Sequence, residues 1–225
     1  MIRLRFRYFV MKLMAHRFFM PSVNRETELH SNSWAAARFD EYFNLVTKNL
    51  AKQIEANQIS TLIEIGTGNA LVVDALLGKY SSKVQYVGYE IDKGLFEIAS
   101  TKLRKYTGCK LSNALLDATD FAETEVGSAL VFVRGVLGCM DRNLRKELLE
   151  QLVAISAQRY VICERVWFHE FERALDFNKN NVSVDFEELR KTFEGYECEI
   201  VRLNSHKQLA IYGSHYQLVF SKHGA

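Results

Sequence analysis

The spacing of apolar positions divides residues 33–222 into alternating helices and strands. Apolar residues recurring every three or four positions predict helices at residues 33–57, 71–80, 93–106 and 142–155. Short, continuously apolar runs predict buried strands at residues 61–65, 84–90, 110–116, 129–133 and 160–166. An alternation of helices with continuously apolar strands is typical of a parallel sheet that is covered by helices on both faces. The pattern therefore predicts an α/β fold with a doubly wound, mostly parallel sheet.

The C-terminal part departs from this alternation. Residues 199–203 and 215–221 predict two strands with no helix between them, so we expect an antiparallel pair that completes a seven-stranded sheet. Before them, Asp185 and Glu188 have the spacing of a capping box, and Gly195 is placed to end the helix. Residues 167–195 begin with an aromatic-rich stretch of little sheet character, and we expect an insertion or lid on the substrate side.

Charge separates a basic arm, residues 1–32, from a domain at residues 33–225. Six of the 29 Lys and Arg residues lie within the first 25 residues, which contain no Asp or Glu. The residues after position 25 therefore carry all 27 acidic residues against 23 basic ones, and this part of the chain lacks the basic balance of a general nucleic-acid binder. For residues 1–20 three interpretations are open: an accessory strand that contacts the body or a second subunit, membrane-surface contact, and an organelle-targeting segment.

Two counts exclude whole classes of protein. No apolar run approaches the ~20 residues that a transmembrane helix needs. The four cysteines have no Cys-x-x-Cys spacing, which argues against a zinc site and a disulfide framework. We therefore expect no metal site and a reducing, cytoplasmic location, with organelle targeting or peripheral membrane attachment through the basic arm as alternatives.

A glycine turn carries the clearest chemical signal. The strand at residues 61–65 leads directly into the sequence Gly66-Thr67-Gly68-Asn69-Ala70, and glycines there let backbone N–H groups approach a ligand. A dinucleotide fingerprint needs glycine where this chain has Leu71. Glu64, Gly66 and Gly68 instead resemble the acid-x-Gly-x-Gly-x-Gly motif of the class I S-adenosylmethionine (SAM)-dependent methyltransferases, from which Ala70 departs.

The resemblance spans roughly residues 33–222 and implies SAM as cofactor and S-adenosylhomocysteine (SAH) as product. Glu90, which ends the second strand, would accept hydrogen bonds from both ribose hydroxyls. Asp117 would hold the adenine amino group, a role for which Asp120 competes. The cofactor-binding residues that we predict are Glu64, Gly66, Thr67, Gly68, Asn69, Glu90, Ile91, Asp117, Ala118 and Arg134.

The fourth-strand region contains no obvious general base. Relatives often place Asn, Asp or His there, where this chain has Arg134, Gly138 and Cys139. Glu164, His169 and Arg134 are therefore our candidate catalytic residues, acting as a base or as groups that position the acceptor. Arg134 has two interpretations: a bidentate contact with an acidic substrate, or an ion pair with Glu64 or Glu90.

These observations favour a methyltransferase that acts on an O or N atom of a small molecule. The alternatives are a protein N-methyltransferase of the lysine type, a catalytically silent partner subunit with the same fold, and an NAD-dependent dehydrogenase. The nucleobase amino-methyltransferases need an Asp/Asn-Pro-Pro-Tyr/Phe motif and the cytosine-C5 enzymes need Pro-Cys. Because Pro21 is the only proline, both of these nucleic-acid classes are excluded.

Overall fold

The computed structural model describes residues 33–121, 128–168, 184–203 and 215–222. The described helices are α3 (Ser33–Ala56), α4 (Leu71–Tyr80), α5 (Lys93–Leu103), α6 (Arg142–Ile155) and α8 (Phe186–Thr192), with short 3-10 helices η1 (Ala118–Phe121) and η3 (Leu137–Cys139). The strands are β1 (Thr61–Ile65), β2 (Gln85–Tyr89), β3 (Cys109–Ser112), β4 (Ala129–Arg134), β5 (Arg159–Trp167), β6 (Val184–Asp185), β7 (Tyr196–Arg202) and β8 (His215–Lys222).

The strands form one mixed sheet in the order β3-β2-β1-β4-β5-β8-β7. The strands β1 to β5 are parallel, and β8 pairs antiparallel with both β5 and β7. This confirms the seven-stranded, doubly wound α/β fold with its antiparallel C-terminal pair. The two-residue strand β6, which pairs with the end of β5, was not expected. Because Ile65 pairs with both Tyr89 and Val133, the carboxyl ends of β2, β1 and β4 meet at one edge of the sheet.

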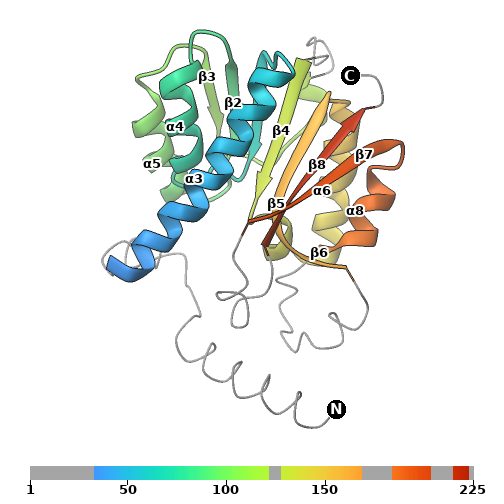
Figure 1. Ribbon diagram of the computed structural model, residues 1–225. Coiled ribbons are helices and arrows are strands. Elements are labelled where there is room, and N and C mark those ends of the chain that lie inside the picture. Colours follow the sequence, from blue (N-terminus) through green and yellow to red (C-terminus); the bar gives the residue numbers. More distant parts are fainter. Residues whose placement is uncertain (1–32, 122–127, 169–183, 204–214, 223–225) are drawn as a thin grey trace.

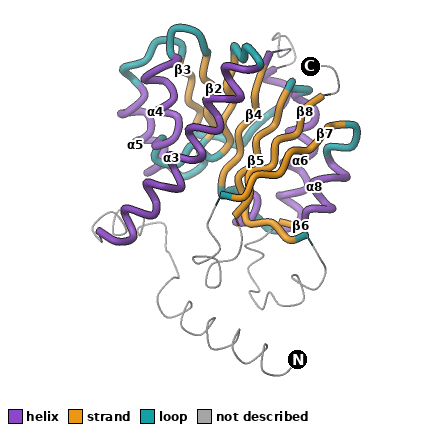
Figure 2. Tube along the Cα trace, viewed as in Figure 1, coloured by secondary structure: helices purple, strands orange, loops and turns teal. Residues whose placement is uncertain are grey.

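Helices cover both faces of the sheet, as Figures 1 and 2 show. On one face Leu62 of β1 packs in a core with residues of α3, α4 and α5. On the other face its neighbour Ile63 packs with residues of α6 and α8. Successive side chains of a strand point to opposite faces, so a continuously apolar strand serves two cores. No described helix is both long and apolar enough to cross a membrane.

Three aspartates begin helices as the sequence indicates. The Asp92 side chain accepts a hydrogen bond from Leu95 N at 2.9 Å, and the Asp141 side chain accepts one from Asn143 N at 2.9 Å. Asp185 likewise accepts from the backbone N–H of the second residue of α8 at 3.0 Å. Each carboxylate satisfies a backbone donor that has no partner within its own helix. These caps fix where α5, α6 and α8 start, and therefore where the preceding loops lie.

Two strand boundaries differ by three residues or more from the sequence-based expectation. β3 ends at Ser112 rather than at residue 116, because Asn113 turns its side chain to the backbone oxygen of Glu90, at 2.7 Å, and leaves the ladder. β7 begins three residues earlier than expected, because Tyr196 pairs with Lys222 of β8. Both boundaries depend on partners that are distant in the sequence.

The segment expected to form a lid is described in part. Residues 169–183 and the basic arm, residues 1–32, lie outside the described residues. Residues 184–203 belong to the fold, since Leu189 and Phe193 are fully buried in the core on the α6 side. The division into an arm, a domain and a lid stays a prediction.

Candidate functional site

The glycine turn after β1 is fixed to the end of β2. The backbone N–H groups of Gly66 and Thr67 both donate to the Tyr89 carbonyl oxygen, at 2.8 and 3.2 Å. Gly66 has a φ of +73°, and a Cβ there would collide with the Val136 side chain, so only glycine fits. Gly68, at φ +58°, has no atom of the described residues within 4 Å of the position that a Cβ would take. The turn is therefore packed on one side and open on the other.

The Glu90 side chain is hydrogen-bonded to this turn. Its Oε2 accepts a hydrogen bond from Gly68 N at 2.6 Å, and its Oε1 accepts one from Asp92 N at 2.8 Å. The side chain is buried. Each carboxylate oxygen has a second lone pair, which leaves acceptor capacity for a ligand hydroxyl at the same place. The structure therefore brings Glu90 and Gly68 together, and the contact with a ribose stays a prediction.

Glu64 supports the turn from within the sheet. It is 2% exposed, and its Oε2 accepts a hydrogen bond from the Tyr86 hydroxyl at 2.7 Å. The same hydroxyl lies 2.9 Å from Thr67 Oγ1. Burial raises the pKa of Glu64 to about 7, while the hydrogen bond from Tyr86 and the positive charge of Arg134 act in the opposite direction. Glu64 and Thr67 are therefore joined through the Tyr86 hydroxyl of β2, and a role of Glu64 toward a cofactor stays a prediction.

The residues expected around the adenine lie beyond β2 and β3. Ile91 follows Glu90 and is 63% exposed, which makes it an apolar surface beside the turn. The Asp120 carboxylate accepts a hydrogen bond from the Tyr89 hydroxyl at 2.8 Å. Asp117 is exposed, and its Oδ1 accepts hydrogen bonds from the backbone and the hydroxyl of Thr119. Asp120 is exposed as well, and contact of either aspartate with the adenine stays a prediction.

Asn69 and Ala118 complete the predicted cofactor set. The Asn69 carbonyl oxygen accepts a hydrogen bond from Lys102 Nζ at 2.9 Å, which ties the turn to α5. Ala118, the first residue of η1, donates its backbone N–H to Gln151 Oε1 at 2.9 Å. These contacts position the turn and the loop after β3, and contact of either residue with a cofactor stays a prediction.

Glu164 is a buried cap. Its Oε1 accepts hydrogen bonds from Val136 N at 2.7 Å and Leu137 N at 2.8 Å, at the start of η3. The residue is 3% exposed. Burial raises its pKa to about 7, and the backbone donors act against that rise. These contacts fix the loop after β4, and a role as base stays a prediction. His169, the second candidate base, lies outside the described residues.

Arg134 ends β4 with an incompletely satisfied guanidinium. Its carbon Cζ lies 4.8 Å from the centre of the Phe43 ring of α3. Its Nε is buried and has no hydrogen-bond partner among the residues that the structure describes. Among the residues described, none of the ion pairs joins Arg134 to Glu64 or Glu90, so that interpretation of Arg134 finds no support. Its charge nevertheless lowers the pKa of both Glu64 and Glu164.

Three site residues escaped the sequence reasoning: Tyr86, Phe43 and Asn113. Tyr86 carries a usable signal, because a tyrosine inside a buried strand needs a partner for its hydroxyl. Asn113 directly follows a strand, where a side chain that bonds to backbone often ends the ladder. Phe43 lies on α3 among other aromatic residues, and nothing in the local sequence distinguishes it.

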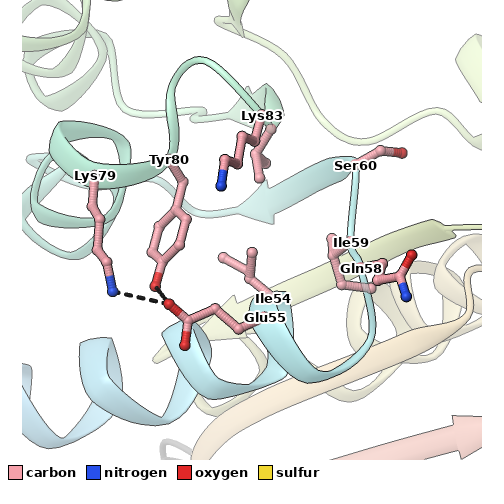
Figure 3. A pocket seen from close by; sticks show the side chains of 9 residues that line it. Ile54, Glu55, Gln58, Ile59, Ser60, Lys79, Tyr80 and Lys83 are labelled. Atoms are coloured by element: carbon pink, nitrogen blue, oxygen red, sulfur yellow. Dashed lines mark hydrogen bonds and ion pairs between the residues drawn. The ribbon is translucent and has the colours of Figure 1, made fainter.

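A separate cavity of about 450 Å³ lies near the amino ends of β1 and β2. Figure 3 shows that Lys79 and Tyr80 point toward the Glu55 carboxylate there, at 2.9 and 2.6 Å. Lys83 extends beside them from the loop that precedes β2. Because the cavity is at the opposite end of β1 from the glycine turn, it is not the site that the motifs predict.

Comparison with solved structures assigns the fold. Neither a protein-family model nor a curated protein matches this sequence. The magnesium protoporphyrin IX methyltransferase ChlM from Synechocystis, solved with SAH, is similar with a TM-score of 0.64 and 10% identity over 88% of this chain and 93% of that protein. The small RNA methyltransferase HEN1 is similar with a TM-score of 0.59 and 14% identity over 81% of this chain. The chain spans 25% of the length of HEN1.

The described chain therefore has the class I, Rossmann-like fold of SAM-dependent methyltransferases. At these identities the likeness shows the fold alone. The [4+2]-cyclase SpnF is also similar, with a TM-score of 0.59 and 11% identity over 79% of both chains. This fold therefore occurs in a protein named for another reaction, and the fold alone does not determine the function.

Proposed function

We propose that this protein is a SAM-dependent methyltransferase that transfers a methyl group to an O or N atom of a small-molecule acceptor. The observation that carries the proposal is the contact between Glu90 and Gly68 at the carboxyl edge of the sheet. It places a buried carboxylate on an open glycine turn. In open α/β sheets, ligands bind at this edge.

The residues present fit SAM. The open side of Gly68 leaves space for a ligand against the backbone. Glu90 has lone pairs left for ribose hydroxyls, and the exposed Ile91 beside it offers an apolar surface for a purine ring. The buried Glu90 carboxylate beside the turn favours a ligand that carries positive charge. NAD carries a diphosphate, which a carboxylate at this place disfavours.

SAM supplies a methyl group on a sulfonium that is already activated. The main task left to the chain is to hold the acceptor atom in line with that methyl group, and positioning of this kind contributes several kcal/mol. A base is needed only when the acceptor must lose a proton. Glu164 lies behind η3 and fixes the loop that follows β4, so it positions that loop whether or not it moves a proton.

A catalytically silent subunit is the second candidate function. Glu164 is engaged with backbone N–H groups, and the described residues contain no exposed His, Asp or Glu after β4 in the place that relatives use for a base. Such a subunit would bind SAM and stabilise an active partner.

Thermal-shift measurements with SAM, SAH and NAD test the cofactor. We expect stabilisation by SAM and SAH, and equal or larger stabilisation by NAD would overturn the proposal. Transfer of labelled methyl from SAM to separated fractions of an extract tests the acceptor. Label in the small-molecule fraction supports the proposal, and label confined to protein would support the lysine-type alternative. Binding of SAM with no transfer to any fraction would favour the silent subunit.

A further inference from the structure

Arg134 starts beside the glycine turn. The residue before it, Val133, pairs with Ile65, the last residue of β1, so Arg134 lies level with Gly66. Phe132, two residues before Arg134 on β4, packs in the core on the α3 side. Because side chains two positions apart on a strand point to the same face, Arg134 extends toward that face as well. A ligand that contacts the turn lies within reach of this side chain.

One face of the Arg134 guanidinium is covered, and its Nε donor is unsatisfied within the described part of the chain. The Phe43 ring lies 4.8 Å from Cζ, which is the geometry of a cation–π contact. This Nε is buried, and none of the residues described accepts a hydrogen bond from it. A buried N–H without a partner is costly, and a guanidinium pairs best with a planar anion that accepts two parallel hydrogen bonds.

The nearby carboxylates do not satisfy that donor. Glu64 accepts its hydrogen bond from Tyr86, and Glu164 accepts its own from Val136 N and Leu137 N. Within the part of the chain that the structure describes, Arg134 takes part in no ion pair. Glu64 and Glu164 therefore compensate its charge at a distance and leave its donors for another group.

We propose that Arg134 binds a carboxylate of a ligand seated at the glycine turn. This inference rests on the proposed function and adds to it. Two sources supply that chemistry: the amino-acid end of SAM, and an acidic group on the acceptor. In either case the Phe43 ring packs against the plane of the guanidinium, and the N–H groups of Arg134 fix the orientation of the ligand carboxylate. Arg134 is then a binding and positioning residue.

Paired ligands separate the two sources. SAH carries the amino-acid carboxylate, and 5′-methylthioadenosine lacks the whole amino-acid end. Calorimetry would compare both ligands with the wild type, Arg134→Gln and Arg134→Lys. The matched control is Arg159→Gln, which removes another guanidinium with a buried, unpartnered Nε from the opposite end of the neighbouring strand β5. Benzoate, titrated into SAH-saturated protein, probes for an acid-binding acceptor site.

If the carboxylate belongs to the cofactor, Arg134→Gln weakens SAH about tenfold or more and leaves methylthioadenosine unchanged. Arg134→Lys keeps part of the affinity for SAH, since lysine keeps the positive charge but cannot donate the two parallel hydrogen bonds of a guanidinium. If the carboxylate belongs to the acceptor, SAH binds both proteins alike and only the binding of benzoate is lost. Arg159→Gln matches the wild type in both arms.

Equal binding of SAH and of benzoate to the wild type and to Arg134→Gln would overturn the inference and leave the proposed function standing. If the wild type binds neither SAH nor methylthioadenosine, the proposed function is overturned instead. Should Arg134→Gln fail to fold, as judged by circular dichroism, Arg134→Lys carries the same comparison. The inference then requires that the ratio of the affinity for SAH to the affinity for methylthioadenosine is smaller in Arg134→Lys than in the wild type.

Discussion

Replacing Glu64 by glutamine should reduce the loss of stability that the protein shows between mildly acidic and mildly basic pH. Glu64 is 2% exposed on the central strand β1, with Tyr86 as its hydrogen-bond donor. Burial raises its pKa from the usual 4.5 to about 7. The folded protein therefore holds a proton on Glu64 in a pH range where the unfolded chain has released it. Stability that depends on this proton is present at low pH and falls as the pH rises from the unfolded pKa to the folded one.

The two pKa values give the magnitude. Between about pH 5 and about pH 8, the ionisation of Glu64 lowers the free energy of unfolding by about 2.5 kcal/mol. Glutamine has nearly the same shape and no ionisation, so E64Q lacks this contribution. Its amide brings a cost of its own, about 1–3 kcal/mol if the new donor finds no partner, but that cost is the same at both pH values. Glu164, whose pKa is also raised, contributes equally to both proteins and cancels.

Urea unfolding at both pH values, followed by circular dichroism, measures the difference. The wild type should lose about 2.5 kcal/mol more stability than E64Q on going from about pH 5 to about pH 8. The control is Glu97→Gln, which changes an exposed glutamate on α5 and should follow the wild type. Equal losses in the wild type and E64Q would refute the reasoning, because they would mean that Glu64 ionises in the folded protein as easily as in the unfolded chain.

Three further predictions follow from the same region. Glu90→Ala should weaken the binding of SAH by about 1–3 kcal/mol in calorimetry, since a buried acceptor is lost from the turn, and unchanged affinity would contradict its place in the site. Gly88→Ala should destabilise the fold by about 1–3 kcal/mol in urea unfolding, because its Cβ would meet Tyr86, Leu111 and Thr67. The matched change Gly78→Ala, on the exposed side of α4, should instead stabilise by about 0.5–1 kcal/mol. Asp141→Ala should cost about 1 kcal/mol in the same assay through loss of the α6 cap, and no loss would mean that the loop before α6 supplies other acceptors.

Local sequence was sufficient to predict the helices, the strands and the glycine turn after β1. Continuous apolar runs set the buried strands, and the aspartates at 92, 141 and 185 set three helix starts. Both signals act over a few residues, so they can be interpreted without knowing what packs nearby. The glycine turn belongs to the same class, because the positive φ of Gly66 and Gly68 is a local requirement of the chain.

Contacts between distant residues had to come from the tertiary structure. Glu164 is adjacent to Val136 only because β5 lies beside β4, and this pairing makes Glu164 a cap for η3. Arg134 meets Phe43 because α3 crosses that face of the sheet, and no local pattern distinguishes this aromatic residue from its neighbours. The chain order alone predicted which residues reach the carboxyl edge. Strand register and burial decided which of their polar groups are already bonded and which remain for a ligand.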